Sequence, residues 1–281
     1  MEVSFIIANY NGKEVIEQCV ESILKQNYPQ EKYEIIVADN NSPDKSWKLV
    51  QKYKKIKLIR NKINYGFIKS NNIAVRASSG NFLVFMNNDV TLKDVDWLKK
   101  MIARIKEDEN LGGIACRILY PVSKKTWYGG AKIYFPGFAK HLDLRKEAYV
   151  DYLGLAAGII RRETGEIYFD ENLEMYGEDA EICKRIRKKG FKLLYYPGAI
   201  AYHHISESRI SENEEYYIQR NRGYYYTKFY GFLSKFIYLI GDILFFFPLF
   251  ASYRIVRNPK RIKFWKKILK ARIDSVRLML R

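Results

Sequence analysis

The first half of the chain alternates short β-branched runs with amphipathic runs. Buried strands are predicted where apolar residues run together, at residues 3–8, 34–38, 57–60 and 82–86. Helices are predicted between them, at residues 15–24, 70–79 and 97–107, where apolar positions recur at helical spacing. This alternation predicts an α/β fold with a doubly wound, mostly parallel, Rossmann-like sheet. Ligands of such sheets collect beyond the carboxyl ends of the strands.

The second half is less regular. From about residue 113 the pattern becomes a series of β-like pieces with glycine-containing turns, which we interpret as an acceptor-side region. A helix is then predicted at residues 178–189, because acids occupy its first turn, basic residues its last half, and Gly190 follows it. A strand is predicted at residues 192–196. The amino end of this helix is expected to point into a site.

The carboxyl-terminal region is rich in Tyr and Phe and then basic. Its longest uncharged stretch, residues 243–253, has 11 residues, short of the ~20 that a membrane-spanning helix needs. After Asn258-Pro259 a basic amphipathic helix is predicted, suited to a lipid surface. Its shared apolar face comprises Ile262, Trp265, Ile268, Leu269, Ile273 and Val276. We expect a catalytic domain at 1–223, in halves 1–112 and 113–223, and a helical, membrane-associating extension at 224–281.

Composition narrows the class of protein. The 281 residues carry a net charge of +18 and are 48% hydrophobic, which excludes a disordered polycation. Residues 254–281 hold eleven Lys or Arg and one Asp, more than half of the net charge. Three widely spaced cysteines exclude a disulfide scaffold or zinc finger. No basic leader precedes the first strand, so we expect a cytoplasmic protein, peripheral on the cytoplasmic face of the membrane.

The basic, aromatic-rich tail raises two interpretations. Lys- and Tyr-rich runs can steer and stack nucleic acid, but a continuous apolar face with Trp265 among aliphatic residues favours a lipid boundary. We therefore expect an anionic membrane surface as a partner of residues 229–281, and no nucleic acid. Alternatively, residues 232–253 pack on the catalytic domain or form the seam of a homodimer.

Polar clusters follow the first two predicted strands. They are Asn9-Tyr10-Asn11-Gly12 and Asp39-Asn40-Asn41-Ser42. An acid at the end of a second parallel strand can accept hydrogen bonds from the base or ribose of a nucleotide. The equal alternative is an Asx-type turn, which Asp, Asn and Ser form routinely.

Two further clusters could bind a metal or move a proton. Asp89, after the strand at 82–86, could bind a divalent cation carried in by a diphosphate, or it could close a turn. Glu178 and Asp179 begin a helix, where capping alone would also favour acids. His203 and His204 are two of only three histidines in the chain, and their pairing favours a metal or phosphate ligand.

Seven segments match one family in their order along the chain. They are residues 5–11, 34–40, 64–67 with Asn72, 80–89, 169–171, 176–179 and 202–204. Together they resemble glycosyltransferase family 2, the inverting enzymes of the GT-A fold, and most closely its rhamnosyltransferase-like branch. The resemblance covers about residues 3–223 and includes Arg220-Asn221 near its end.

The resemblance implies a role for each matching residue. The nucleotide would be held by Asn9, Tyr10, Asp39, Asn40, Gly66, Asn72 and Asn88. Asp89 would coordinate a divalent metal, Mn²⁺ or Mg²⁺, and His203 would complete or support that site. Asp179 would be the general base, with Glu178 beside it as the second catalytic carboxylate. In two departures from the pattern, Asn87 and Asn88 take the first positions of the DXD-like element, and Leu155 stands where glycine usually precedes an Arg-Arg-Glu element.

The implied function is inverting transfer of a sugar from a UDP-, dTDP- or GDP-sugar to a hydroxyl of a glycan or lipid-linked acceptor in polysaccharide biosynthesis. Two alternatives remain. One is a catalytically silent nucleotide-sugar-binding or scaffold protein of the same fold. The other is a nucleotidyltransferase, for which the segment at residues 9–12 is a poor match because it lacks a Gly-rich, basic phosphate loop.

Overall fold

The computed structural model describes residues 1–134, 138–205, 212–231 and 259–279, together with positions 233, 240, 241 and 244. The chain divides into two compact units. The first unit comprises Met1–Lys132, Ala139–Glu174 and Glu178–Glu207, and the second comprises Ile133–Phe138, Met175–Gly177 and Ser208–Arg281. The division thus falls before the expected boundary at residue 223. Residues 232–253 could insert in a membrane, pack on the catalytic domain or form a dimer seam. Most of them lie outside the described residues.

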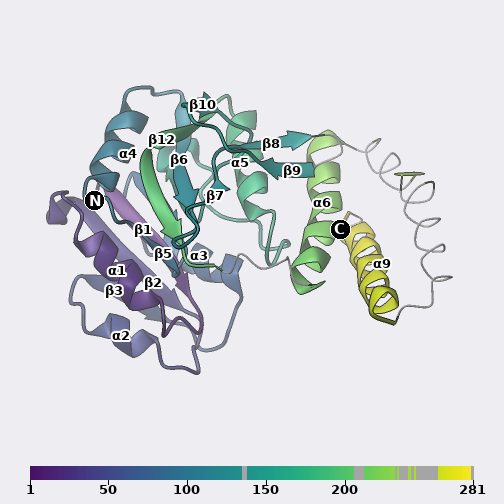
Figure 1. Ribbon diagram of the computed structural model, residues 1–281, viewed down its shortest axis with the longest axis horizontal. Helices are drawn as coiled ribbons and strands as arrows, with labels where there is room; N and C mark the ends of the chain where they lie inside the picture. The colour runs from purple at the N-terminus through teal and green to yellow at the C-terminus, as the bar shows by residue number, and fades with distance from the viewer. Residues whose placement is uncertain are drawn as a thin grey trace. The chain divides into compact units, whose positions relative to one another are not determined.

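A sheet with helices packed against it forms the frame of the first unit (Figure 1). Six of its described strands run in the same direction. They are β1 (Val3–Asn9), β2 (Tyr33–Asp39), β3 (Ile56–Arg60), β4 (Phe82–Met86), β6 (Leu111–Leu119) and β12 (Lys192–His203). Every residue of β1 and of β4 is buried. This burial on both faces is typical of parallel strands covered by helices, and it explains why these strands read as continuous apolar runs.

Antiparallel strands make the sheet mixed. They are β5 (Val90–Thr91), β7 (Thr126–Tyr128), β10 (Ala148–Tyr149) and β11 (Ala157–Arg161). In the described residues the path is β10-β12-β6-β11-β4-β1-β2-β3, with β5 on β12 and β7 on β6. A separate two-stranded sheet consists of β8 (Ala131–Tyr134) and β9 (Phe138–His141). β11 is inserted between two strands of the parallel set, because it pairs antiparallel with both β4 and β6.

The helices of the first unit pack on the sheet. They are α1 (Ile16–Leu24), α2 (Trp47–Gln51), α3 (Phe67–Arg76), α4 (Trp97–Lys106) and α5 (Glu178–Lys188), with short 3₁₀ turns at Gln30–Lys32 and Arg162–Thr164. α3 packs on β1 and β2, α4 on β6 and β12, and α5 on β12. Burying one large apolar side chain contributes about 1.5–3 kcal/mol, so the fully buried Phe5, Phe85 and Trp97 are major sources of stability.

Two predicted elements differ from those observed by more than one residue at an end. The helix predicted at residues 70–79 is α3, which starts earlier because Gly66 takes a positive φ of 85° and begins the turn. The strand predicted at residues 192–196 extends as β12 to His203. A register shift between Tyr196 and Ile200 lets β12 continue past Pro197, since a bulge removes the need for a ladder hydrogen bond there.

The three cysteines are buried and unpaired, as the sequence indicates. Burial raises the pKa of the Cys19, Cys116 and Cys183 thiols. They therefore remain protonated near neutral pH and serve as small apolar side chains.

The second unit contains two long helices that pack on each other, α6 (Glu212–Tyr230) and α9 (Pro259–Met279). The buried strip of α9 consists of Ile268, Ala271, Arg272 and Ser275. Of the apolar face predicted for this helix, Ile268 is buried, whereas Ile273 is exposed. No described helix is both long and apolar enough to cross a membrane.

Candidate active site

The predicted polar clusters lie at one edge of the sheet in the first unit. Because β1, β2, β4 and β12 run in the same direction, their carboxyl ends meet at this edge. Asn9 ends β1, Asp39 ends β2, and His203 ends β12, while Asn87–Asp89 follow β4 directly. The antiparallel β11 begins at the same edge, because Ala157 pairs with Met86 at the end of β4.

The Asn9 side chain is the centre of a buried hydrogen-bond network. Its Nδ2 donates to Asp39 Oδ1 over 2.8 Å and to Ser46 Oγ over 2.9 Å, and its Oδ1 accepts from Asn88 Nδ2 over 2.9 Å. The Ser42 hydroxyl donates to Asp39 Oδ1 over 2.6 Å, and the Ser42 amide to Oδ2 over 3.1 Å. Asp39 therefore forms the turn that was one of its two predicted roles. Its contact with a nucleotide stays a prediction.

Asn40 joins the ends of β2 and α3. Its Nδ2 donates to the Gly66 carbonyl over 3.0 Å, and its Oδ1 accepts from Asn61 Nδ2 over 2.9 Å. Tyr10 is 46% exposed at the same edge, so its ring is available to a ligand. These contacts fix the shape of the floor beside the carboxyl ends of the strands.

Asn72 serves a different segment. It donates to the Phe169 carbonyl over 2.9 Å and to Glu171 Oε1 over 3.1 Å, and it accepts from the Phe169 amide over 2.9 Å. Because its amide is committed to residues 169–171, it holds this segment against α3. A direct nucleotide contact of Asn72 stays a prediction.

Gly12 leaves space for the network. A Cβ at this position would lie 2.2 Å from Asn9 Oδ1 and 2.6 Å from Asn88 Nδ2. Neither atom can move cheaply, because Asn9 is completely buried and bonded at both ends. The preceding Asn11 has a φ of 52°, a left-handed conformation that Asn tolerates better than most residues.

Asp89 and His203 face each other, and their role as metal ligands stays a prediction. His203 Nε2 lies 3.0 Å from Asp89 Oδ1, and Asn87 Nδ2 lies 3.4 Å from the same nitrogen. Within the described residues no group of three His, Cys, Asp or Glu side chains could hold a metal ion. One carboxylate and one imidazole nevertheless fit a cation that takes its remaining ligands from phosphate oxygens and water. His204 bonds elsewhere, with its Nε2 2.9 Å from the Thr91 hydroxyl.

Glu178 and Asp179 occupy the first turn of α5. Asp179 Oδ2 accepts a hydrogen bond from the Leu155 amide over 3.0 Å. Glu178 Oε2 is buried and has no hydrogen-bond partner within the described part of the chain. Glu181, the third acid of this turn, is fully buried but is neutralised by Arg185, whose Nε lies 2.8 Å from its Oε1.

Burial raises the pKa of Glu178 above its usual range. Burial also raises the pKa of Asp179, and the nearby Glu178 carboxylate adds to this effect, while the Leu155 hydrogen bond opposes it. Both residues keep part of their surface open to solvent. Their carboxyl groups therefore lose hydration while the site stays accessible. Raised carboxyl pKa values in a partly open site are typical of groups that exchange protons.

The backbone of Leu155 and Ala156 joins the acids to the Asp89 loop. The Ala156 carbonyl accepts from the Asn87 amide over 3.0 Å, one residue from the amide that binds Asp179. The segments containing Asp89, His203 and Asp179 therefore converge at this edge of the sheet, although they are far apart in sequence.

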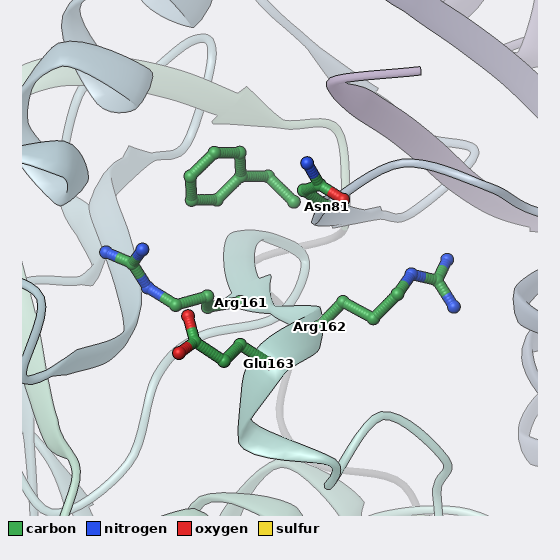
Figure 2. A pocket seen from close by; sticks show the side chains of 5 residues that line it. Asn81, Arg161, Arg162 and Glu163 are labelled. Atoms are coloured by element: carbon green, nitrogen blue, oxygen red, sulfur yellow. The ribbon is translucent and has the colours of Figure 1, made fainter.

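The Arg161-Arg162-Glu163 segment lies at the opposite edge, because Arg161 pairs with Phe82 at the start of β4. With Asn81 and Phe82 it lines a cavity of about 390 Å³, and Figure 2 shows the two arginine side chains pointing in different directions. Arg161 donates to the Leu111 and Ile105 carbonyls over 3.0 and 2.8 Å, and Arg162 donates to the Gly80 carbonyl over 2.6 Å. These bonds tie α4 and the start of β4 to β11, so this segment stabilises the fold away from the candidate site.

Sequence reasoning missed the supporting residues. Ser46 and Asn61 hold Asn9 and Asn40 in place, yet each looks like an ordinary loop residue in the sequence. The contribution of Leu155 and Ala156 is made by the backbone, which leaves no side-chain signal.

Solved structures with this arrangement of strands are those of the GT-A fold. A mannosyltransferase from Pyrobaculum calidifontis in complex with GDP-Man and Mn²⁺ aligns with a TM-score of 0.64 and 14% identity, covering 98% of this chain and 87% of that one. TarS residues 1–349 from Staphylococcus aureus, in complex with UDP, align with a TM-score of 0.58 and 20% identity, covering 80% of this chain and 65% of that one.

The sequence model of glycosyl transferase family 2 matches residues 4–164. The chain belongs to this family. It is 27% identical over 230 residues to the O-antigen biosynthesis protein RfbC of Myxococcus xanthus, covering 74% of this chain and 18% of that protein. It is 25% identical over 240 residues to a poly(ribitol-phosphate) β-N-acetylglucosaminyltransferase, TarS, of Staphylococcus aureus, covering 78% of this chain and 39% of that protein. The chain thus spans less than half the length of these curated relatives.

Gly12→Ala is expected to break the Asn9–Asn88 hydrogen bond and to weaken nucleotide binding at least several-fold, because the new Cβ occupies the space of both side-chain ends. The measurement is titration calorimetry with UDP and GDP in the presence of Mn²⁺. Gly241→Ala, at a glycine whose added Cβ would meet nothing within 4 Å, is the control. Unchanged affinity in Gly12→Ala would contradict the role of this network in shaping the nucleotide site.

Asp179→Asn and Glu178→Gln are each expected to raise the melting temperature at pH 8. A carboxyl whose pKa is raised by folding stabilises the fold while it is protonated, and this contribution is lost as the pH rises through the raised pKa. An uncharged amide avoids the loss, so the gain should shrink towards pH 5. For a unit of this size each kcal/mol corresponds to about 2–4 °C. Scanning calorimetry at both pH values tests this, and lower melting temperatures for both variants at pH 8 would refute it.

Proposed function

We propose that this protein is an inverting glycosyltransferase that moves a sugar from a nucleoside-diphosphate sugar to an acceptor hydroxyl. The observation that supports this best is the link through Leu155 and Ala156, which holds the Asp179 carboxylate beside the loop containing Asp89. Such a site brings together a group that removes a proton and a group suited to a metal–diphosphate. Family membership supports the same reaction class.

Asp89 and His203 are the residues that would hold a divalent cation. A bound Mn²⁺ or Mg²⁺ would neutralise the charge that develops on the departing diphosphate. The solved structures of the Pyrobaculum calidifontis mannosyltransferase and of GalNAc-T7 contain Mn²⁺, which supports this proposal for the present chain. Asn87, 3.4 Å from His203 Nε2, would help to orient the imidazole.

Asp179 would act as the general base. Its carboxylate would take the proton of the acceptor hydroxyl as that oxygen attacks the anomeric carbon on the face opposite the diphosphate, which inverts the configuration. A raised pKa makes Asp179 a stronger base than an ordinary Asp, and such proton transfer typically contributes 10²- to 10⁴-fold to a rate. A protonated Glu178 beside it would avoid a second negative charge in the same buried turn.

The nucleotide site would be formed by Asn9, Tyr10, Asp39, Asn40, Gly66 and Asn88, with Asn72 as support. Relatives were solved with UDP, UDP-GlcNAc and GDP-Man, so the proposed donor class is a UDP-, dTDP- or GDP-sugar. A dTDP-rhamnose donor rests on the resemblance to the rhamnosyltransferase-like branch. The names of the relatives support a glycan or lipid-linked acceptor in polysaccharide biosynthesis.

Asp179→Asn is expected to reduce sugar transfer and donor hydrolysis at least 100-fold while the affinity for the nucleotide changes little, because the base is lost and the Asn9 network is intact. Release of nucleoside diphosphate from UDP-glucose, UDP-GlcNAc, GDP-mannose and dTDP-rhamnose, with Mn²⁺ or with EDTA, measures the reaction. Glu178→Gln is the matched variant. If Glu178→Gln is inactive and Asp179→Asn is active, the two roles are reversed. Wild-type protein that binds the donors but releases no diphosphate would support a catalytically silent binding protein.

We further propose that the protein is peripheral on the cytoplasmic face of the membrane, and that α9 contacts the anionic surface there. Its buried strip packs within the second unit, whereas Lys263, Lys266 and Lys270 are exposed at helical spacing on one face. Attraction of basic residues to an anionic leaflet contributes about 1 kcal/mol each. The proposed contact is therefore chiefly electrostatic, with less apolar insertion than the sequence pattern alone predicts.

Replacing Lys263, Lys266 and Lys270 together by Glu should abolish flotation of the full chain with vesicles containing 30% phosphatidylglycerol. The wild type should float with these vesicles in low salt and much less with pure phosphatidylcholine, because the charge attraction is screened by salt. The control reverses Lys54, Lys99 and Lys132, which are exposed residues of the first unit and change the net charge equally. Equal flotation of the two triple variants would reject α9 as the contact.

A further inference from the structure

A cluster of aromatic rings lies beside His203 in the first unit. The Trp127 ring contacts His203 edge to face, with centroids 4.7 Å apart and planes at 81°. The same indole contacts His141, with centroids 5.1 Å apart and planes at 68°. His141 is thus separated from the candidate metal ligand by a single ring. It is the one histidine of the chain that the sequence motifs leave without a role.

Two tyrosines near Asp179 also lie beside His141. Its ring lies 5.4 Å from Tyr128 and 5.9 Å from Tyr152, measured between centroids. Burial raises the pKa of both phenols, and the negative charge of Asp179 adds to the effect on each. Tyr128 and Tyr152 are also joined, because the Tyr128 hydroxyl donates to the Tyr152 carbonyl over 2.8 Å. His141 is therefore one ring away from His203 through Trp127, and it contacts two tyrosines that lie near Asp179.

The tautomer of His141 follows from its hydrogen bond. Its Nδ1 lies 2.8 Å from the Trp127 carbonyl oxygen, which can only accept, so Nδ1 carries the proton. In a neutral imidazole the other nitrogen, Nε2, then presents a lone pair. Within the described residues Nε2 has no hydrogen-bond partner, and the residue keeps part of its surface open to solvent although its ring is largely surrounded by other side chains.

The environment favours this neutral form. Loss of hydration lowers the pKa of His141 below its usual range, and the bond to the Trp127 carbonyl only partly offsets this. The chemistry of a suitable ligand follows. A neutral lone pair accepts a hydrogen bond from a hydroxyl group but repels a phosphate oxygen, which has no proton to donate near neutral pH.

We propose that His141 is an acceptor-binding residue whose Nε2 accepts a hydrogen bond from a non-reacting hydroxyl of the acceptor sugar. The hydroxyl that reacts would lie against Asp179, and the partly exposed ring of Trp127 would contact the sugar between these two groups. This inference rests on the proposed function and specifies its acceptor: the group next to the reacting hydroxyl is a sugar or polyol unit and not a phosphate.

Two amide variants separate binding from structure. The side-chain amide of Asn reaches the position of Nδ1, so His141→Asn retains a donor to the Trp127 carbonyl but offers nothing at Nε2. The longer Gln places its amide oxygen near the position of Nε2, so His141→Gln retains the acceptor. His141→Ala removes both. Lys140→Ala, at the exposed neighbour on β9, is the matched control.

The experiment uses the full chain with UDP-glucose, UDP-GlcNAc and GDP-mannose, Mn²⁺, and a set of p-nitrophenyl hexopyranosides as acceptors. We expect His141→Ala and His141→Asn to raise the KM for the glycoside about 3- to 10-fold, the effect of one neutral hydrogen bond, with a smaller change in the KM for the donor. His141→Gln should stay within about twofold of the wild type, as should Lys140→Ala.

Three results would overturn the proposal. In the first, His141→Asn restores the KM and His141→Gln does not, which assigns the residue to support of the Trp127 backbone. In the second, none of the variants changes the KM for the glycoside. In the third, the wild type hydrolyses a donor but transfers to no glycoside, which rejects a sugar subsite while leaving the proposed function intact. A wild type that does not cleave any donor would instead reject the proposed function, and this inference with it.

Discussion

The candidate site depends on one antiparallel strand set between parallel ones. Because β11 runs against β4 and β6, its first residues lie at the edge where the parallel strands end. The Ala156 carbonyl then binds the loop after β4, and the adjacent Leu155 amide binds Asp179. Two backbone groups that the sheet itself fixes in place thus connect the two halves of the unit. Side chains alone would have to pay more conformational entropy to hold the same geometry.

The two halves of the site differ in how their polar groups are satisfied. Asn9 and Asp39 are completely buried, and their hydrogen bonds are made to one another and to nearby serines, so this region is rigid and stable. At the start of α5, by contrast, Glu178 Oε2 is buried without a partner in the described chain. An unsatisfied buried carboxylate costs stability. The electrostatic cost therefore lies at the start of α5, where a proton would have to move. The polar groups around Asn9, by contrast, are held by hydrogen bonds.

Much of the architecture follows from local patterns. The strands β1, β2 and β4 and the helices α4 and α5 are recognisable because burial on both faces, or on one helical face, leaves a clear periodicity. The position of Asp89 at this edge follows from strand direction, because it comes directly after β4. The positions of His203 and Asp179 also depend on the bulge in β12 and on the bond from the Leu155 amide. The insertion of β11 cannot be predicted locally, because strand order depends on contacts between residues far apart in sequence. The continuation of β12 past Pro197 was missed for a related reason, since a bulge is a property of the pair of strands. His141 had no motif to mark it, and its surroundings become visible only when Trp127, Tyr128 and Tyr152 meet around it.

At the opposite edge of the sheet, arginine side chains stabilise the fold. There the guanidinium groups of Arg161 and Arg162 donate hydrogen bonds to main-chain oxygens, including that of Ile105 near the end of α4. The bonds that stabilise the fold therefore lie at one edge of the sheet and the candidate site lies at the other, about one strand length apart. Because the two edges are separate, a substitution in the loops that follow Asn9 or contain Asp89 leaves the bonds of Arg161 and Arg162 intact.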